Sequence, residues 1–166
     1  MAEFLPAVEI LLKHEGGYAP SDNNRGSVRY GWTEKSLRDL GLPDRPETLT
    51  RERAMTLYCV WFWHRSRCDE IRDQRLATLY FSMTVNSGPD PAARCLQMAL
   101  RDLGAEVVVD GIVGRKTLKA VNEADAAALI ERYKAHLLAR YARLAHEKPE
   151  LYADDLPGWK ARLETL

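Results

Sequence analysis

Apolar residues recur at three- and four-residue intervals along most of this chain. In the first such stretch Phe4, Val8 and Leu11 fall on one face, which predicts a helix over residues 2–15. The same spacing continues along the chain and indicates a mainly α protein. Asp90 is the expected N-cap of one of the later helices. The further helices that the spacing predicts cover residues 34–40, 50–67, 73–85, 90–103, 117–121, 125–147 and 159–166.

The region that follows the first helix has a different pattern. Residues 20–26 are dense in turn formers, and the run from Ser27 to Trp32 is expected to form a short strand or one arm of a hairpin. A second β-prone run, Val107 to Val109, leads into an Asp-Gly turn. We therefore expect a helical fold with a short β-hairpin or loop after the first helix.

Composition restricts the environment and the partners of the protein. Its 166 residues include 24 acidic and 24 basic side chains, so no overall field draws it to nucleic acid. No run approaches the roughly 18 apolar residues of a membrane span, and no signal peptide is recognisable, so we expect synthesis in the cytoplasm without stable membrane insertion. Three cysteines without a CxxC spacing favour free thiols. Since repeats and linker-like runs are absent, one compact unit is expected.

Glu15 is the first candidate for chemistry. It continues the apolar stripe of the first helix, and Gly16 and Gly17 are expected to end that helix directly after it. Apolar surroundings and the negative end of the helix dipole both raise the pKa of a carboxyl group, which suits a general acid. The alternative is an ordinary solvated glutamate beside a glycine cap.

Other common catalytic constellations are missing from the sequence. The four histidines show no metal-ligand spacing, and there is no phosphate-binding loop, nucleophile elbow or dinucleotide fingerprint, so no metal or cofactor is expected. A hydrolase based on carboxylates remains, and such enzymes use a second group opposite the acid. Asp22, in the polar turn, is the nearest candidate, although an aspartate there also suits a hydrogen bond to its own backbone.

Several short motifs occur in order along nearly the whole chain. They are Lys13-His14-Glu15-Gly16-Gly17-Tyr18; Arg25-Gly26 followed by Tyr30-Gly31-Trp32-Thr33; Leu57-Tyr58 and Phe62-Trp63; Val85-Asn86-Ser87-Gly88-Pro89; Leu96-Gln97 and residues 110–117; and Gly158-Trp159 with Arg162. In this order and spacing the chain resembles glycoside hydrolase family 108, the N-acetylmuramidases of phages and bacteria.

The resemblance implies a lysozyme-like helical fold. Residues 1–85 would form the catalytic segment, and residues 86–166 a peptidoglycan-binding-like segment packed on it. Glu15 would take the position of the catalytic acid and protonate the leaving oxygen when the β-1,4 bond between N-acetylmuramic acid and N-acetylglucosamine is hydrolysed, without a cofactor. Residues implied to bind the glycan strand, with Tyr30 or Trp32 stacking on a sugar, are Tyr18, Ser27, Tyr30, Trp32, Thr33 and Asn86.

The chain departs from the family pattern at two positions. Val28 stands where a threonine is common, and in lysozyme-like sites such a hydroxyl holds the attacking water. Either Ser27 replaces it through a shift in register, or activity is reduced. Ser82 stands where the family often has an aspartate, and we expect its hydroxyl to keep a structural hydrogen bond.

The leading hypothesis is a monomeric phage-type endolysin that reaches the cell wall through the membrane pore of a holin. A non-catalytic peptidoglycan-binding protein is a second hypothesis, which Val28 favours and an intact Glu15 opposes. A third is a lytic transglycosylase, in which a hydroxyl of the sugar replaces water. For residues 110–117 simple packing against the helices is at least as well founded as independent wall binding.

Overall fold

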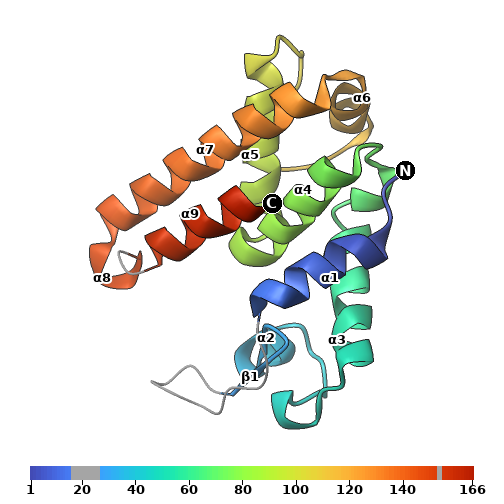
Figure 1. Cartoon of the computed structure of the whole chain (residues 1–166), viewed down its shortest axis with the longest axis vertical. Coiled ribbons are helices and arrows are strands. Elements are labelled where there is room, and N and C mark those ends of the chain that lie inside the picture. The colour runs from blue at the N-terminus through green and yellow to red at the C-terminus, as the bar shows by residue number, and fades with distance from the viewer. Residues whose placement is uncertain (16–26, 153–154) are drawn as a thin grey trace.

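Helices form where the apolar spacing predicts them, so the mainly α class is confirmed (Figure 1). The computed structural model describes residues 1–15, 27–152 and 155–166, and at residues 14 and 15 the backbone alone. The α-helices are α1 (Phe4–Glu15), α2 (Glu34–Asp39), α3 (Arg51–Tyr58), α4 (Gln74–Ser87), α5 (Pro89–Asp102), α6 (Arg115–Glu123), α7 (Ala126–Glu147), α8 (Pro149–Tyr152) and α9 (Leu156–Thr165). Short 3-10 or π segments are η1 (Pro46–Thr48), η2 (Cys59–His64) and η3 (Cys68–Glu70), and the strands are β1 (Val28–Arg29) and β2 (Trp32–Thr33).

Polar side chains begin several helices by binding backbone N–H groups of the first turn. Thr50 caps α3 and Asp73 caps α4, each accepting from an N–H group at 3.2 Å and 3.0 Å respectively. The expected cap at Asp90 is wrong, because α5 begins at Pro89 with Gly88 as its N-cap. Proline already has the φ angle of a helix and lacks the N–H that would need a partner there, so the helix starts two residues earlier than its polar signal suggests.

Helix α4 forms the centre of the molecule. All its residues from Leu76 to Thr84 are buried, and α1, α5 and η2 pack around it. Phe4 of α1 makes edge contacts with the rings of Trp63 and Phe81, at centroid distances of 5.7 Å and 5.9 Å. These contacts fix the direction of α1 and therefore the position of its C-terminal end.

A short hairpin after the first helix is present as expected, but the run from Ser27 to Trp32 contains its turn and does not form a single arm. Strands β1 and β2 pair antiparallel, with Val28 opposite Thr33 and Arg29 opposite Trp32. The two turn residues both have positive φ angles, 52° at Tyr30 and 80° at Gly31. Such a two-residue turn matches the natural twist of a hairpin, and it accommodates glycine far more easily than tyrosine.

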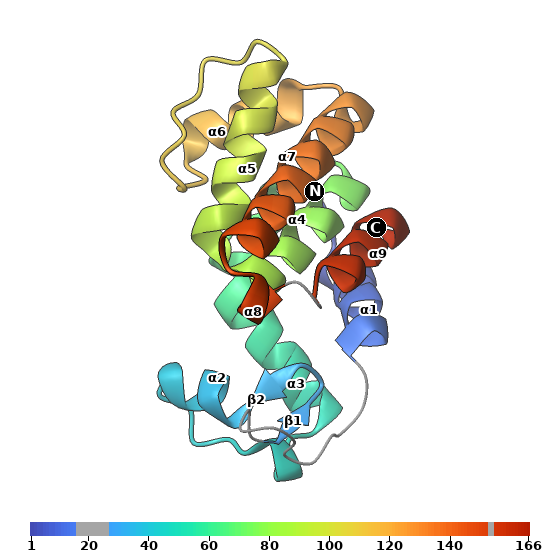
Figure 2. The same cartoon turned by 90° about the vertical axis from the view of Figure 1, so that its left-hand side faces the viewer.

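The C-terminal half surrounds the pair α5 and α7, with α6 at the far end from the hairpin (Figures 1 and 2). The β-prone run Val107–Val109 is not a strand: among the described residues it has no pairing partner, because the chain passes along the outside of α5. The expected turn after it is confirmed at Gly111, whose φ is 81°. Within the described ranges, no helix combines the length and apolar character that crossing a bilayer requires.

Candidate active site

The end of α1 lies close to three other elements. In both views it points toward the β1–β2 hairpin and passes near α9, and α4 ends on the same side (Figures 1 and 2). Glu15 is the last helical residue, in agreement with the expected helix end. Its side chain lies outside the described part of the chain, as do Tyr18 and Asp22 in full. Their expected roles therefore stay predictions.

Ser27 is tied to a carboxylate that the sequence did not single out. Its side chain is 7% exposed, and its hydroxyl donates to Glu47 of η1, whose backbone carbonyl also accepts from Arg29 at 3.0 Å. The bond from Ser27 holds the pKa of Glu47 below its ordinary value, so this carboxyl is ionised at neutral pH. The hydroxyl proton of Ser27 is thus committed to Glu47, and Val28 faces Thr33 across the hairpin.

Tyr30 and Trp32 lie close together but differ in exposure. The backbone carbonyl of Tyr30 accepts a 2.9 Å hydrogen bond from the hydroxyl of Tyr58, which holds the strained turn in place, and its ring is half-buried. Trp32 is only 2% exposed and packs against Tyr58 and Phe62, with centroids 4.9 Å and 6.0 Å away. This burial leaves no face of Trp32 open to a sugar, so of the two rings expected to stack only Tyr30 stays a candidate.

Thr33 has a local structural role. Its hydroxyl accepts from the backbone N–H of Ser36 at 3.0 Å, while the Ser36 hydroxyl accepts from the backbone N–H of Thr33 at 2.9 Å. This reciprocal pair is a capping box at the start of α2. Thr33 therefore fixes α2 to the hairpin, and its side chain is committed to that cap.

Asn86 lies on a different element from the other expected residues. It is in the last turn of α4 and lines an open hollow of about 440 Å³ whose opposite wall is α9. On that wall Trp159 stacks on Tyr141 at 4.5 Å and 29°, and Arg162 lines the hollow beside it. An aromatic ring, an amide and a guanidinium together suit a polar ligand with apolar faces, such as a sugar.

In the sequence, Trp159 and Arg162 stand out only as part of the closing motif. The signal was their spacing, three residues apart, which places both on one side of a helix. Nothing in the sequence placed that side opposite Asn86. The hollow thus combines residues that lie more than 70 positions apart.

Ser82 corrects a smaller expectation. It lies in the middle of α4, is 1% exposed, and its hydroxyl has no hydrogen-bond partner among the described residues. The expected structural hydrogen bond is therefore wrong. The described residues also contain no group of three or more histidine, cysteine or acidic side chains arranged to hold a metal ion.

Comparison with known proteins gives two family matches that meet at the end of α4. Residues 8–88 match the family described as Glycosyl hydrolase 108, and residues 91–164 match the family described as Predicted Peptidoglycan domain. Among solved structures, SagA from Brucella abortus is similar, with a TM-score of 0.74 at 22% identity, over 98% of this chain and 94% of that one. At this identity the likeness concerns the fold. No match was found among curated proteins.

Proposed function

We propose that this chain, whose residues 8–88 belong to the glycosyl hydrolase 108 family, is an N-acetylmuramidase. The two family matches together support a glycoside hydrolase that acts on peptidoglycan. The observation that carries the finer proposal is that α1 ends on Glu15 and points toward the hairpin, on the side of the molecule where α4 also ends. A carboxyl at the C-terminal end of a helix experiences the negative end of the dipole, which favours its protonated form.

In this mechanism Glu15 is the general acid. It gives its proton to the glycosidic oxygen while the bond from that oxygen to C1 of N-acetylmuramic acid breaks. Water then bonds to C1 and loses a proton to a second carboxylate, for which we propose Asp22. Without a protonated donor the alkoxide is a poor leaving group, so Glu15 is the residue on which turnover depends most.

The glycan strand would pass between the hairpin and α9. Tyr30 offers a half-buried ring for one sugar, and Asn86 with Trp159 and Arg162 offers a polar wall for the next. Tyr18, Ser27 and Thr33 complete the proposed site, with Ser27 and Thr33 holding the hairpin in place through Glu47 and the α2 cap. The positive charge of Arg162 suits the carboxylate that distinguishes N-acetylmuramic acid from N-acetylglucosamine.

For the cellular role we propose a monomeric endolysin of the phage type. It would be made in the cytoplasm, pass the inner membrane through a holin pore and act on the wall. The experiment is lysis of a bacterial host on expression with and without a holin. Lysis that occurs only when the holin is expressed together with the protein supports this route. Equal lysis with and without the holin contradicts it.

Release of reducing ends from purified peptidoglycan tests the catalytic proposal. We compare the native protein with Glu15→Gln, which keeps the size of the side chain and removes the proton donor. The variant should be slower by about 100- to 10,000-fold, the usual contribution of a general acid. A variant that retains more than a tenth of native activity contradicts the assignment of Glu15.

A lytic transglycosylase is the second candidate, and the hairpin favours it specifically. That reaction needs no residue to hold an attacking water, and here Val28 replaces the expected hydroxyl while Ser27 donates to Glu47. Its products end in 1,6-anhydro rings and carry no reducing end. A non-catalytic wall-binding protein, the third candidate, would release no ends of either kind.

A further inference from the structure

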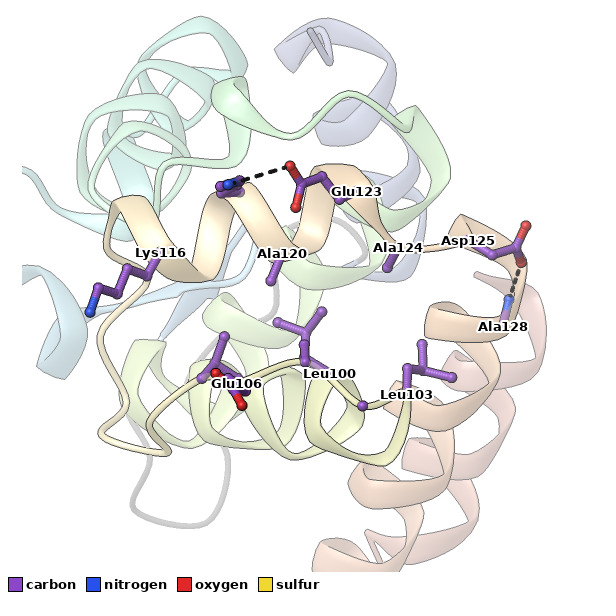
Figure 3. A pocket seen from close by; sticks show the side chains of 13 residues that line it. Leu100, Leu103, Glu106, Lys116, Ala120, Glu123, Ala124, Asp125 and Ala128 are labelled. Carbon is purple, nitrogen blue, oxygen red and sulfur yellow. Dashed lines mark hydrogen bonds and ion pairs between the residues drawn. The ribbon is translucent and has the colours of Figure 1, made fainter.

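A second open groove lies in the C-terminal half, at the opposite end of the molecule from the hairpin. It has a volume of about 790 Å³ and runs between the end of α5 with residues 104–107 on one side and α6 with the start of α7 on the other (Figure 3). Figure 1 places α6 far from the end of α1. This groove is therefore separate from the candidate active site.

The lining of the groove differs in kind from that of the hollow at Asn86. Leu100 and Ala120 face each other across it from α5 and α6, and Ala124 and Ala128 continue the apolar side toward α7 (Figure 3). No aromatic ring and no amide side chain occurs among the residues that line it. Sugars need such groups for stacking and for paired hydrogen bonds, so the lining disfavours a glycan as the occupant.

Two charged side chains of opposite sign are available on the groove. Lys119 pairs with Glu123 at 3.8 Å, and Asp125 accepts from a backbone N–H of α7 at 2.8 Å. By contrast, Lys116 on α6 and Glu106 on the opposite side have no ion-pair partner in the described part of the chain. A ligand that carries both a carboxylate and an amine complements this pair.

Next to the groove runs a backbone segment, residues 105–109, that has no strand partner within the described part of the chain. The segment from Ala105 to Val109 is held by Arg94, which donates to the carbonyl of Val109 at 2.9 Å, and by a bond within the segment. The backbone N–H and C=O groups of Glu106 and Val108 have no partner among the described residues, and the Val108 side chain is 73% exposed. Backbone N–H and C=O groups without partners, such as these, are available for hydrogen bonds with a bound peptide.

We propose that this groove binds the stem peptide of peptidoglycan. Stem peptides are short, have small methyl side chains, and carry several carboxylates with one side-chain amine. Their alanine methyls fit the apolar floor, a carboxylate pairs with Lys116, the amine pairs with Glu106, and the peptide backbone pairs with residues 105–109. This inference rests on the proposed function, since it takes the wall as substrate. It adds a second contact, to the peptide, at a distance from the sugar cleft.

The test is an NMR titration of the full chain, labelled with ¹⁵N, using the synthetic tetrapeptide L-alanyl-γ-D-glutamyl-meso-diaminopimelyl-D-alanine. Saturable shifts should appear at residues 100–128. Ala120→Trp fills the groove and should abolish them, whereas Ala135→Trp, on an exposed position of α7, should not. Lys116→Glu should weaken binding by about threefold to tenfold, because it reverses one charge of an exposed ion pair. Arg132→Glu, which makes the same charge change on α7, should not.

The outcomes separate this inference from the proposed function. Shifts confined to the groove and lost in Ala120→Trp support the inference. No saturable shift, shifts elsewhere, or equal binding by Ala120→Trp overturns it, as does groove binding of glycan strands stripped of their peptides. Reducing-end release from stripped strands, measured in parallel with Glu15→Gln as the inactive control, tests the proposed function alone, because those strands contain no peptide.

Discussion

Gln97 holds residues 110–112, in the same loop as the groove-lining residues 104–107. Replacing this side chain should lower the stability of the protein by an amount that can be worked out from its hydrogen bonds. The side chain is completely buried in α5. Its amide nitrogen donates to the Asp110 carboxylate at 2.8 Å, to the Ile112 carbonyl at 3.0 Å and to the Thr117 hydroxyl at 3.4 Å. Its amide oxygen accepts from the backbone N–H of Gly111 at 2.9 Å. One side chain thus replaces the backbone pairing that this loop lacks.

The variant Gln97→Met keeps the approximate volume and removes all four bonds. Three of them have good geometry, and at about 1 kcal/mol each the free energy of unfolding should fall by about 3 kcal/mol. For a chain of this size that corresponds to a melting temperature lower by roughly 6–12 °C. Urea unfolding followed by circular dichroism at pH 7 measures the change directly.

Gln97→Glu is the matched control for the donor. It keeps an acceptor for the N–H of Gly111 but places a second carboxylate against Asp110. Repulsion between the two charges raises the pKa of the new carboxyl at position 97 in the folded state. The variant should be least stable at neutral pH and should regain stability as the pH falls and that carboxyl is protonated. A loss below about 1 kcal/mol in Gln97→Met would refute the reasoning that this amide organises the loop.

Three further predictions concern other parts of the molecule. Asp44→Asn should lower stability by about 1 kcal/mol at pH 7, because Arg53 donates to that carboxyl at 2.8 Å and 3.0 Å and holds its pKa below the ordinary value. In urea titrations this difference should persist above about pH 4 and vanish as the pH falls through the folded-state pKa. Of the three thiols, Cys59 alone should react with Ellman's reagent in the native state, and slowly, since burial raises its pKa; the other two are buried and should react only in urea. Val28→Thr should raise the rate of reducing-end release severalfold, and an unchanged rate would show that no hydroxyl is needed there.

The apolar periodicity was sufficient to predict the longer helices, because each packs an apolar face on a neighbouring helix: α1 and α5 on α4, α6 and α7 on α5, and α9 on α7. A hairpin after the first helix was also predictable, but its turn was not, because Tyr30 and Gly31 lie inside the run from Ser27 to Trp32 that was expected to form one strand or arm. The start of α5 was misplaced because Asp90 has the chemistry of a cap, yet Pro89 sets the backbone.

The candidate site depends on contacts that are distant in sequence, and these were not predictable. The hydroxyl of Ser27 reaches Glu47, and the ring of Trp32 is enclosed by Tyr58 and Phe62. Neither contact follows from local spacing. The wall that α9 forms opposite Asn86 is likewise a consequence of the tertiary fold.

We propose that Glu15 drives hydrolysis at N-acetylmuramic acid. The most direct test of this role is digestion of purified peptidoglycan in ¹⁸O-labelled water by the native protein and by Glu15→Gln, followed by mass spectrometry of the new chain ends. If Glu15 is the general acid of a hydrolase, the native protein should produce N-acetylmuramic acid reducing ends that carry one ¹⁸O atom at C1, and the variant almost none. Labelled ends at N-acetylglucosamine, unlabelled 1,6-anhydro ends, or equal release by the variant would contradict this proposal.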